Sequence, residues 1–424
     1  MKTKDKIRCI LIENSGKNVS GEFLACECGV SRAAIWKAVN SLREDGLKIE
    51  GTTNGGYRLL NAQDILSEAT IRSDLQFFAR GDGSGSCEDA GRGGEAGDGK
   101  SGACASGEKE NLRNTAERLL HSKIQVFEEI DSTNSYAKRL LSEAGNLRDG
   151  EGNLTEAGKK LSNSIYIAEK QTAGRGRLGR TFYSPEKNGV YISMIYAPRG
   201  GIKNPALVTA LAAVAVKRAI KTLYNLHVQI KWINDIFYNG KKLCGILAEG
   251  ITNFESGLIE AAVVGIGLNV YSNFGGGIPD KDRSVIGSIQ ESLAGLEKQN
   301  LQKSAVTAEN PEDLQNGVKS QASSLFRSKV AALIALEFFS IMEIISESEN
   351  NLQNLMDEYQ KASFLIGREV LVHPVAGAVT GAEKESYRAK VLGIDQSASL
   401  LVQLEDGSRK CLSSGEVSIG SGNV

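Results

Sequence analysis

The apolar positions of residues 1–65 first follow a helical period and then give way to short alternating stretches. Ile35, Val39 and Leu42 recur at the spacing of one helix face, and a shorter helical pattern comes just before them. Two short apolar stretches then flank the Asn-Gly dipeptide at 54–55, which is a strong hairpin signal. Two helices joined by a tight turn and followed by a hairpin predict a winged helix over residues 1–65.

Short apolar runs alternate with helical patterns in the middle of the chain, which predicts a domain of mixed strands and helices at 115–362. Its clearest helix runs from 205 to about 224, because Asn204 can cap it and Pro205 suits its first turn. The expected strands of this domain are 123–127, 164–168, 189–196, 228–232, 242–249 and 258–264.

A second helical tract covers 325–359 and has a break near 347–351. The strands expected after it are 369–373, 387–394, 400–404 and 410–412. Short strands without intervening helices predict a small all-β domain at 366–420.

Three stretches are too polar to belong to a packed core. Residues 81–107 contain ten glycines among Ser, Asp and Glu. Such a composition cannot bury enough surface to offset its ordering entropy, so it predicts a flexible linker. Residues 142–162 and 291–322 are expected to be polar insertions on the surface of the mixed domain.

Composition and charge narrow the function classes. The 424 residues carry 50 Lys and Arg against 51 Asp and Glu, so the net charge of −1 argues against a globally basic nucleic-acid binder or a membrane-surface protein. The seven cysteines show no CxxC pair, which argues against a zinc site or a disulfide framework. The longest largely apolar run, 206–216, is far shorter than the ~20 residues that span a bilayer. We therefore expect a cytoplasmic protein.

A basic, glycine-rich motif, QTAGRGRLGR, occupies 171–180. Residues 170–180 contain four cations and no acids, and the interleaved glycines let the backbone approach a ligand closely. This pattern suits a loop that closes over a phosphate or a phosphoanhydride. It also fits a flexible surface loop or an RNA-binding arginine-glycine tract.

A second motif, KWIND, places Lys231 in an otherwise apolar strand, ahead of Asp235 and Lys242. Burying an ammonium group alone is costly, so Lys231 must be paired or face a ligand. Asp235 could bind Mg²⁺ or accept a proton from an attacking amine. The alternative is a plain hairpin whose Lys242 reaches solvent. A third motif, DSTN at 131–134, precedes a helix and is typical of a helix cap.

In this order, DSTN, QTAGRGRLGR, KWINDI, KKLCGIL and VVGIGLNV resemble the motifs of the biotin–protein ligases. Together with SRAAIWK in the helix-turn-helix, GGYRL at the wing and GEVS near the end, they make the chain similar to the bifunctional ligase–repressor type. The resemblance covers about 320 of the 424 residues. It implies an α+β multidomain fold, with a winged helix, a mixed-sheet catalytic domain similar to class II aminoacyl-tRNA synthetases, and a C-terminal SH3-like β-barrel.

The family makes biotinyl-5′-AMP from biotin and ATP, and then transfers biotin to a lysine of a carboxylase carrier domain. The resemblance thus implies ATP, Mg²⁺ that arrives with ATP, and biotin as substrate, with no metal site of the protein itself. The implied catalytic residues are Arg177, Asn234, Asp235 and Lys242. The implied biotin-binding residues are Ser132, Thr133, Asn134, Gln171, Arg175, Gly176, Arg177 and Lys242. The implied ATP- and adenylate-binding residues are Gly174, Arg175, Gly176, Arg177, Arg180, Lys231, Trp232 and Asn269.

The chemistry of these residue types agrees with the implied reaction. A carboxylate that attacks a phosphate meets charge repulsion, which Arg and Lys neutralise as the new bond forms. The product is already an activated acyl group, so the second step needs a neutral amine and exclusion of water. Ile233 departs from the family, where Pro is common at this place, and the polar linker is longer than the resemblance implies. The alternatives are a ligand-sensing winged-helix repressor without ligase activity and a lipoate–protein ligase.

The N-terminal domain has a local positive charge that the average over the chain conceals. Residues 1–60 contain ten Lys and Arg and seven Asp and Glu, a net +3. The expected DNA-binding residues are Ser31, Arg32, Ala33, Trp36, Lys37, Arg43 and Arg58. The implied partners are operator DNA, a biotin carboxyl carrier domain and, in a ligand-promoted homodimer, a second copy of the chain. The alternative is a head that binds no DNA.

Overall fold

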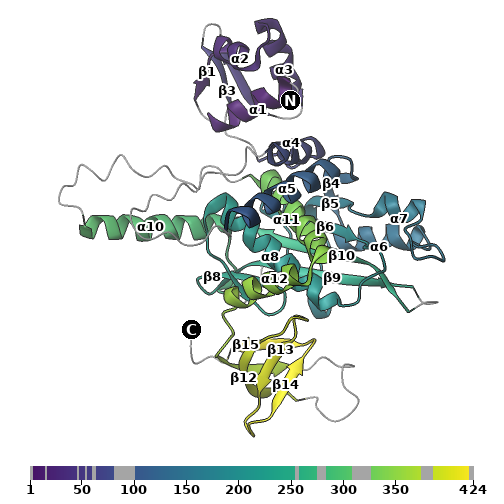
Figure 1. The fold of residues 1–424 in the computed structure, drawn as a ribbon. Coiled ribbons are helices and arrows are strands. Elements are labelled where there is room, and N and C mark those ends of the chain that lie inside the picture. Colours follow the sequence, from purple (N-terminus) through teal and green to yellow (C-terminus); the bar gives the residue numbers. More distant parts are fainter. Residues whose placement is uncertain are drawn as a thin grey trace.

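Figure 1 shows three units that follow one another along the chain in a computed structural model. The structure describes residues 3–14, 17–44, 47–52, 55–59, 64–80, 101–253, 257–274, 283–307, 326–373 and 385–419. Within these ranges, no helix is long and apolar enough to cross a membrane.

The N-terminal unit, called the head below, has the helix-turn-helix and the hairpin that the apolar pattern predicts (Figure 1). Ile35, Val39 and Leu42 are buried in its core, and the backbone N–H of Ala34 donates to Ser31 Oγ at the helix start. Of the expected hairpin turn, Asn54 lies outside the described residues. The elements are α1 (Thr3–Glu13), β1 (Asn18–Val19), α2 (Gly21–Cys28), α3 (Arg32–Glu44), β2 (Ile49–Thr52) and β3 (Gly56–Leu59).

A seven-stranded sheet with the order β4-β5-β6-β10-β9-β8-β7 forms the centre of the molecule. β4 and β5 pair in parallel and every other neighbouring pair is antiparallel, so the sheet is mixed as expected. The strands are β4 (Ile124–Ile130), β5 (Ile165–Gln171), β6 (Gly189–Tyr196), β7 (Gln229–Lys231), β8 (Asp235–Tyr238), β9 (Lys241–Thr252) and β10 (Ile259–Asn269). β8 was not among the expected strands.

Helices cover both faces of this sheet (Figure 1). One face packs against α8 (Pro205–Tyr224), α11 (Arg327–Glu347) and α12 (Glu349–Ala362). Asn204 Oδ1 accepts from the N–H groups of Ala206 and Leu207, which confirms the expected cap of α8. The other face packs against α6 (Thr133–Glu143). The expected break in the long helical tract lies at Ser348, between α11 and α12.

The packed core extends further toward the N-terminus than the domain bounds drawn from the sequence. α4 (Glu68–Ala79) and α5 (Ser101–Leu119) pack against α11 and contribute Ile71, Leu75 and Ala116 to the core. α5 begins inside the stretch expected to be linker, so the linker assignment is wrong for residues 101–107. Residues 81–100 lie outside the described residues.

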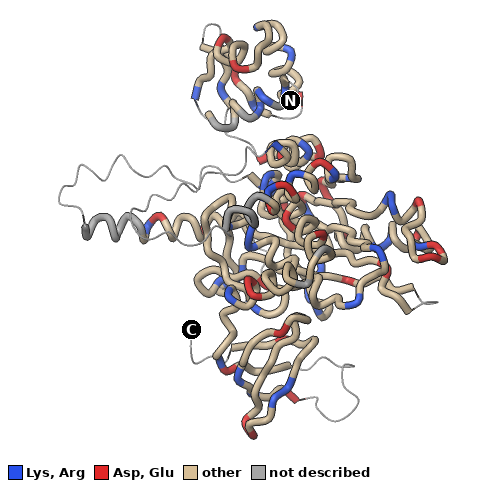
Figure 2. Tube along the Cα trace, viewed as in Figure 1, with Lys and Arg blue, Asp and Glu red and all other residues tan. Residues whose placement is uncertain are grey.

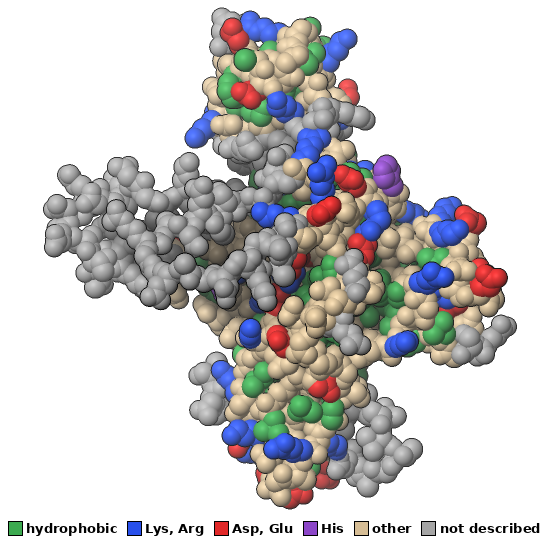
Figure 3. Space-filling view, in the orientation of Figure 1, with side chains coloured by type: hydrophobic (Ala, Val, Ile, Leu, Met, Phe, Trp, Pro, Cys, Tyr) green, Lys and Arg blue, Asp and Glu red, His purple; other side chains and the backbone are tan. Residues whose placement is uncertain are grey.

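The insertion expected at 142–162 is folded into the domain, which corrects its assignment as a polar surface insertion. It contains α7 (Glu156–Leu161), and Leu147 and Leu161 are buried against α6 and the sheet. Arg148 is also buried, and it donates to the carbonyl oxygen of Glu260 at 3.2 Å. The outer surface of the segment 142–162 is polar. Figure 3 shows cationic and acidic side chains interspersed over the lobe formed by α6 and α7. That polar surface explains the prediction.

The other expected insertion, 291–322, is helical in the part that is described, because α10 spans Ile289–Thr307. Residues 308–322 lie outside the described residues. The C-terminal unit is a five-stranded antiparallel sheet with the order β14-β13-β12-β11-β15. Its strands are β11 (Glu369–His373), β12 (Tyr387–Ile394), β13 (Leu400–Gln403), β14 (Arg409–Leu412) and β15 (Glu416–Ile419).

Candidate active site

A cavity of about 150 Å³ lies between the central sheet and the C-terminal sheet, and it brings the three sequence motifs together. Most of the predicted site residues line it: Ser132, Thr133, Asn134, Gln171, Arg175, Gly176, Arg177, Arg180, Lys231, Trp232, Asn234, Asp235 and Lys242. A larger cavity of about 1120 Å³ adjoins it and includes Asn269. Gly174 lines neither. We refer to the two cavities together as the cleft.

The uncharged end of the cleft is a hydrogen-bonded cluster at the start of α6. Ser132 caps this helix through the N–H of Ser135, so part of the DSTN motif is indeed a helix cap. The backbone N–H and the hydroxyl of Thr133 lie 2.9 and 3.2 Å from Gln171 Oε1. Ser193 Oγ lies 2.7 Å from Thr133 Oγ1 and 2.6 Å from Asn134 Oδ1. These bonds fix the rotamers of the cluster, as a specific polar pocket requires.

Two glycines of β10 form the floor of this pocket. A Cβ at Gly265 would lie 2.2 Å from Asn134 Oδ1, and a Cβ at Gly267 would lie 2.4 Å from the ring of Phe182. No real Cβ makes contacts this close, so any side chain here would displace the pocket wall. Gly174 has a comparable constraint, since its Cβ would lie 2.3 Å from the carbonyl oxygen of Phe182. Its role in this structure is close backbone packing.

The basic loop after β5 is held by contacts to the KWIND motif and to the C-terminal sheet. Arg177 donates to Asn234 Oδ1 at 3.0 Å and to the carbonyl oxygen of Gly415 at 2.9 Å. Arg180 forms a bidentate pair with Glu416, at 2.6 and 2.7 Å. Burial alone would raise the pKa of Glu416, but the hydrogen bonds from Arg180 lower it below its ordinary value. The C-terminal sheet thus forms one wall of the cleft.

The KWIND motif turns from β7 into β8 and presents Lys231, Asn234 and Asp235 to the cleft. Lys242 Nζ lies 2.8 Å from Asp235 Oδ1, so Lys242 is ion-paired. Asn234 Nδ2 donates to Asp235 Oδ1 at 2.9 Å and to the Ile246 carbonyl oxygen at 3.1 Å. Trp232 is buried, and its indole N–H donates to the carbonyl oxygen of Ala398 at 2.8 Å. Trp232 therefore also anchors the C-terminal sheet.

The cations of the cleft fall into two groups. Arg177, Arg180 and Lys242 are bonded to protein groups, as described above. Arg175 and Lys231 have no hydrogen-bonded or ion-paired side-chain partner within the part of the chain that the structure describes. Burial lowers the pKa of Lys231, although Asp235 and Glu416 partly oppose the effect. An unpaired, desolvated ammonium group in a cleft has its lowest free energy when an anion is bound.

The geometry of the cleft suits a ligand with an uncharged polar end and an anionic end. Two profiles of known families match the chain, the "Biotin/lipoate A/B protein ligase family" at residues 153–269 and "HTH domain" at residues 3–58. The bifunctional ligase/repressor BirA of Escherichia coli is 25% identical over 98% of this chain and 97% of that protein. The protein of the same name from Bacillus spizizenii is 30% identical over 65% of this chain. The chain therefore has a region that matches the biotin/lipoate ligase family, preceded by a region that matches a helix-turn-helix domain, as in the bifunctional relatives.

The alignment with the B. spizizenii relative spans 66% of that protein, just under two thirds of its length. Among solved structures, the biotin protein ligase from Aquifex aeolicus in complex with biotin and ATP is 20% identical, with a TM-score of 0.47. This similarity covers 70% of the chain and 97% of the A. aeolicus chain.

Of the residues predicted to bind DNA, Ser31 precedes α3, five lie on α3 and Arg58 lies on β3. Figure 2 shows Lys and Arg positions spread over the head. Trp36 is 57% exposed, and Lys37 is exposed as well. Arg43 donates to the carbonyl oxygen of Ile49 at 2.9 Å, so it ties α3 to the hairpin. Arg58 pairs with Glu50 at 2.6 Å, and Arg32 pairs with Glu22 at 3.3 Å.

Sequence reasoning missed several residues of the site because they come from other parts of the fold. Ser193 lies on β6 outside the motifs, and Glu416 lies on β15 in the GEVS motif, which carried no expectation of a site residue. The signal for Gly265 and Gly267 was present in the VVGIGLNV motif, where two glycines interrupt an apolar strand and indicate a close approach. In the part of the chain that is described, no group of three His, Cys, Asp or Glu could hold a metal ion.

Proposed function

We propose that the protein is an ATP-dependent biotin–protein ligase that forms biotinyl-5′-AMP and transfers biotin to a lysine of a biotin carboxyl carrier domain. One observation carries the proposal: a rigid uncharged pocket at Thr133, Asn134 and Gln171 opens into a cleft lined by Arg175, Arg177, Arg180, Lys231 and Lys242. The pocket suits the neutral ureido ring of biotin, and the cations suit the phosphates of ATP.

In the first step, a carboxylate oxygen of biotin bonds to the α-phosphorus of ATP and pyrophosphate leaves with the electron pair of the broken P–O bond. Both reactants are anions, so the rate depends on cations near the forming bond. Lys242 and Arg177 are the candidates, and each must exchange its protein partner, Asp235 or Asn234, for the ligand. Magnesium that arrives with ATP would neutralise further phosphate charge.

In the second step, the neutral amine of the carrier lysine attacks the acyl carbon of biotinyl-5′-AMP and AMP leaves. The amine loses a proton, and Asp235 is the carboxylate closest to Lys242 that could accept it. Asn234 holds Asp235 in place through its side-chain amide. The loop at 172–180 would exclude water from the mixed anhydride, which hydrolysis would otherwise destroy.

The second part of the proposal is transcriptional: the head binds operator DNA, and bound biotinyl-5′-AMP promotes a homodimer that represses biotin-related genes. Exposed Trp36 and Lys37 on α3 support this role. We also infer that the central sheet is of the class II aminoacyl-tRNA synthetase type and the C-terminal sheet of the SH3 type. The site of action would be the cytoplasm, where ATP and carboxylases are available.

ATP-dependent transfer of labelled biotin to a purified carrier domain tests the ligase. Lys242→Ala and Arg177→Gly are expected to lower the rate by about 10²–10³-fold each. Lys241→Ala is the matched control, because Lys241 is the neighbouring lysine and pairs with Glu291 outside the cavity that holds the motifs. Lipoate in place of biotin tests the other substrate named in the family description. Transfer of lipoate but not biotin would contradict the proposal.

A saturable, salt-sensitive shift of the upstream DNA of the gene by the adenylate-bound protein tests the repressor role. Lys37→Ala is expected to weaken this shift, since Lys37 is exposed on α3. Lys17→Ala, which changes another lysine of the same domain, is a control for net charge. Equal weakening by the two variants would mean that charge alone, without a recognition helix, accounts for binding.

A further inference from the structure

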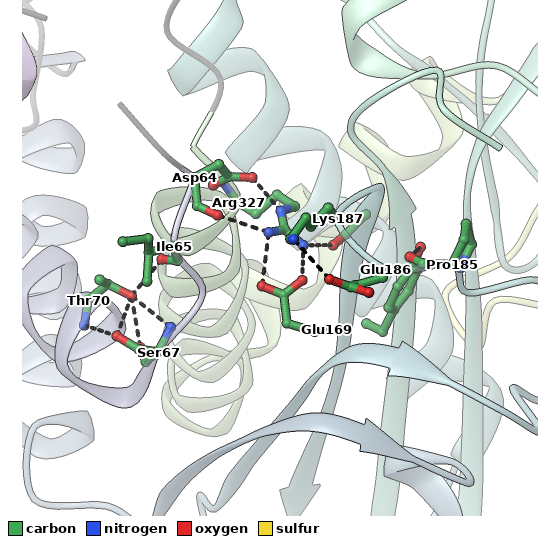
Figure 4. A network of polar contacts seen from close by, with 11 residues as sticks. Asp64, Ile65, Ser67, Thr70, Glu169, Pro185, Glu186, Lys187 and Arg327 are labelled. Carbon is green, nitrogen blue, oxygen red and sulfur yellow. Dashed lines mark hydrogen bonds and ion pairs between the residues drawn. The ribbon is translucent and has the colours of Figure 1, made fainter. Parts of the chain in front are cut away.

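Arg327, the first residue of α11, has a guanidinium group whose five N–H donors are all used. The side chain is 1% exposed. Nε donates to the Asp64 carboxylate, and Nη2 donates to the Asp64 carbonyl oxygen at 2.9 Å and to Glu169 Oε1 at 3.0 Å. Nη1 donates to Glu169 Oε2 at 2.6 Å and to the carbonyl oxygen of Gly189 at 3.4 Å. Figure 4 shows Arg327 between the two carboxylates.

The two carboxylates belong to different parts of the molecule. Asp64 is the first described residue after the wing and precedes Ser67, which caps α4, so it belongs to the segment that connects the head to the catalytic domain. Glu169 lies on β5, two residues before Gln171 of the pocket. Arg327 therefore links the head's connector to the strand that ends at the ligand pocket.

A second bond ties the connector to the other side of the cleft. The Tyr271 hydroxyl is hydrogen-bonded to the Asp64 carboxylate, and burial is the main reason that the pKa of Tyr271 is raised. Tyr271 lies two residues after Asn269, which lines the larger cavity. The Asp64 carboxylate thus contacts groups from the ends of β5 and β10, through Arg327 and Tyr271.

A charge of the head lies close to α4 at the same end of α11. Burial raises the pKa of Asp74 on α4, and the charge of Arg8 on α1, which is itself buried, partly opposes this rise. The Ser328 hydroxyl, next to Arg327, is hydrogen-bonded to Asp74. Asp64 therefore joins the connector to Arg327, and Asp74 joins α4 to Ser328 close to the charge of Arg8.

A buried Arg between two carboxylates gives more geometric specificity than stability, because the desolvation of the ions offsets much of their attraction. The bidentate geometry holds only while the Glu169 carboxylate stays in one position. A shift at the end of β5 therefore changes how Arg327 holds Asp64. The planar guanidinium group of Arg327 thus holds two carboxylates at once, that of Glu169 near the ligand pocket and that of Asp64 on the connector.

We propose that Arg327 is a positioning residue that joins the ligand cleft to the head, so that ligand binding at the ends of β5 and β10 changes how firmly Asp64 and the head are held. The identity of the ligands rests on the proposed function. The coupling is reciprocal, so a head held by DNA changes ligand affinity by the same factor.

Hydrogen–deuterium exchange on the full-length protein, with and without biotin and MgATP, tests this proposal. In the wild type, the ligands are expected to slow exchange in residues 64–75 by about tenfold. Asp64→Asn places an amide donor against the N–H groups of Arg327. In this variant, exchange in the same peptide is expected to be about tenfold faster without ligands, and the response to ligands is expected to disappear. Glu186→Gln is the matched control, because Glu186 pairs with Lys187 beside the network but is exposed (Figure 4).

Arg327→Lys is the second variant, because it keeps the charge but cannot bind both carboxylates as a fork. It is expected to lose most of the ligand response while ATP–pyrophosphate exchange stays within about threefold of the wild type. A full ligand response in Asp64→Asn and Arg327→Lys would overturn the proposal. Wild type that catalyses ATP–pyrophosphate exchange without any response at 64–75 would overturn it and leave the proposed function intact. Absence of that catalysis in the wild type would instead count against the proposed function.

Discussion

Two clusters of charged side chains lie near the end of β5: one includes Glu169 of this strand, and the other includes Arg175 and Arg177 of the loop that follows it. The two clusters differ in burial and in hydrogen bonding. The cleft cluster, Arg175, Arg177, Arg180, Lys231 and Lys242, lines a cavity, and two of its cations have no side-chain partner in the described part of the chain. In the α11 cluster, Arg327 with Asp64 and Glu169, the arginine is buried, the two carboxylates are largely buried, and every guanidinium donor is used. Unused bonding capacity is typical of a ligand-binding site, and fully used bonding capacity is typical of a structural contact within the protein.

Arg327→Met is expected to have the largest effect on stability. It leaves two carboxylates buried without their cation, which costs about 3–5 kcal/mol of the free energy of unfolding. Urea denaturation followed by far-ultraviolet circular dichroism measures the loss. Adding Asp64→Asn and Glu169→Gln to the same chain is expected to recover part of it, since the orphaned charges are removed. A loss below about 1 kcal/mol would mean that the α11 cluster behaves like an exposed pair.

Glu337 is a buried carboxylate that, unlike those of the α11 cluster, has no close bond to its neighbouring arginine. Its carboxylate lies 4.0 Å from Arg218, which donates at 2.7 Å to Glu358 instead. Burial raises the pKa of Glu337 to about 7 from an ordinary 4.5. The folded protein therefore keeps a proton on Glu337 that the unfolded chain loses, so the stability due to Glu337 falls as the pH rises from 4.5 to about 7.

Glu337→Gln removes this dependence on pH. The variant is expected to gain roughly 3 kcal/mol of unfolding free energy relative to the wild type between about pH 4.5 and pH 7, since each pKa unit corresponds to about 1.4 kcal/mol. Urea midpoints across that range measure the difference. Glu343→Gln is a control on the same helix, where the half-exposed carboxylate already has a hydrogen bond from Thr115 at 2.9 Å. Parallel curves for wild type and Glu337→Gln would contradict the prediction.

Lys231→Met, a substitution in the cleft cluster, is expected to lower the catalytic rate without lowering the free energy of unfolding. Loss of an unpaired cation from the proposed phosphate site is expected to slow ATP–pyrophosphate exchange by about 10–100-fold. Because burial lowers the pKa of Lys231, the folded protein holds this charge at a cost, and the variant is expected to be as stable as the wild type or more stable. Lys231→Arg should retain much of the activity. An unchanged exchange rate in Lys231→Met would remove Lys231 from the ligand site.

The two clusters also differ in how far the sequence could predict them. Gln171, Arg177 and Lys242 lie in short motifs, and a resemblance between motifs identifies such residues without any knowledge of the fold. Arg327 lies at a helix start beside a polar stretch, where most arginines are exposed. Its burial depends on Asp64 and Glu169, which are distant in sequence. Local patterns carry no information about such partners.

The difference between local and distant sequence signals also explains which helices and strands could be predicted. The helix at Pro205–Tyr224 and the strand at Gly189–Tyr196 have local signals, a cap and an apolar run, and both are observed. The buried Leu147 and Leu161 were missed because each stands alone in a polar stretch and is buried only by contacts with α6 and the sheet. Burial of isolated apolar residues is a tertiary effect that periodicity does not report.

The pair formed by Arg180 and Glu416 is expected to have the smallest effect on stability. It tests whether burial or bidentate geometry distinguishes the two clusters. Their bonds are short and bidentate, like those of Arg327, but Arg180 is 67% exposed and Glu416 28%. Exposed pairs contribute about 0–1 kcal/mol and are screened by salt. A double-mutant cycle with Arg180→Gln and Glu416→Gln, measured by urea denaturation at low and high salt, is expected to give a coupling energy in that range that decreases with salt. A salt-independent coupling above about 2 kcal/mol would show that bidentate geometry, and not burial, distinguishes the two clusters.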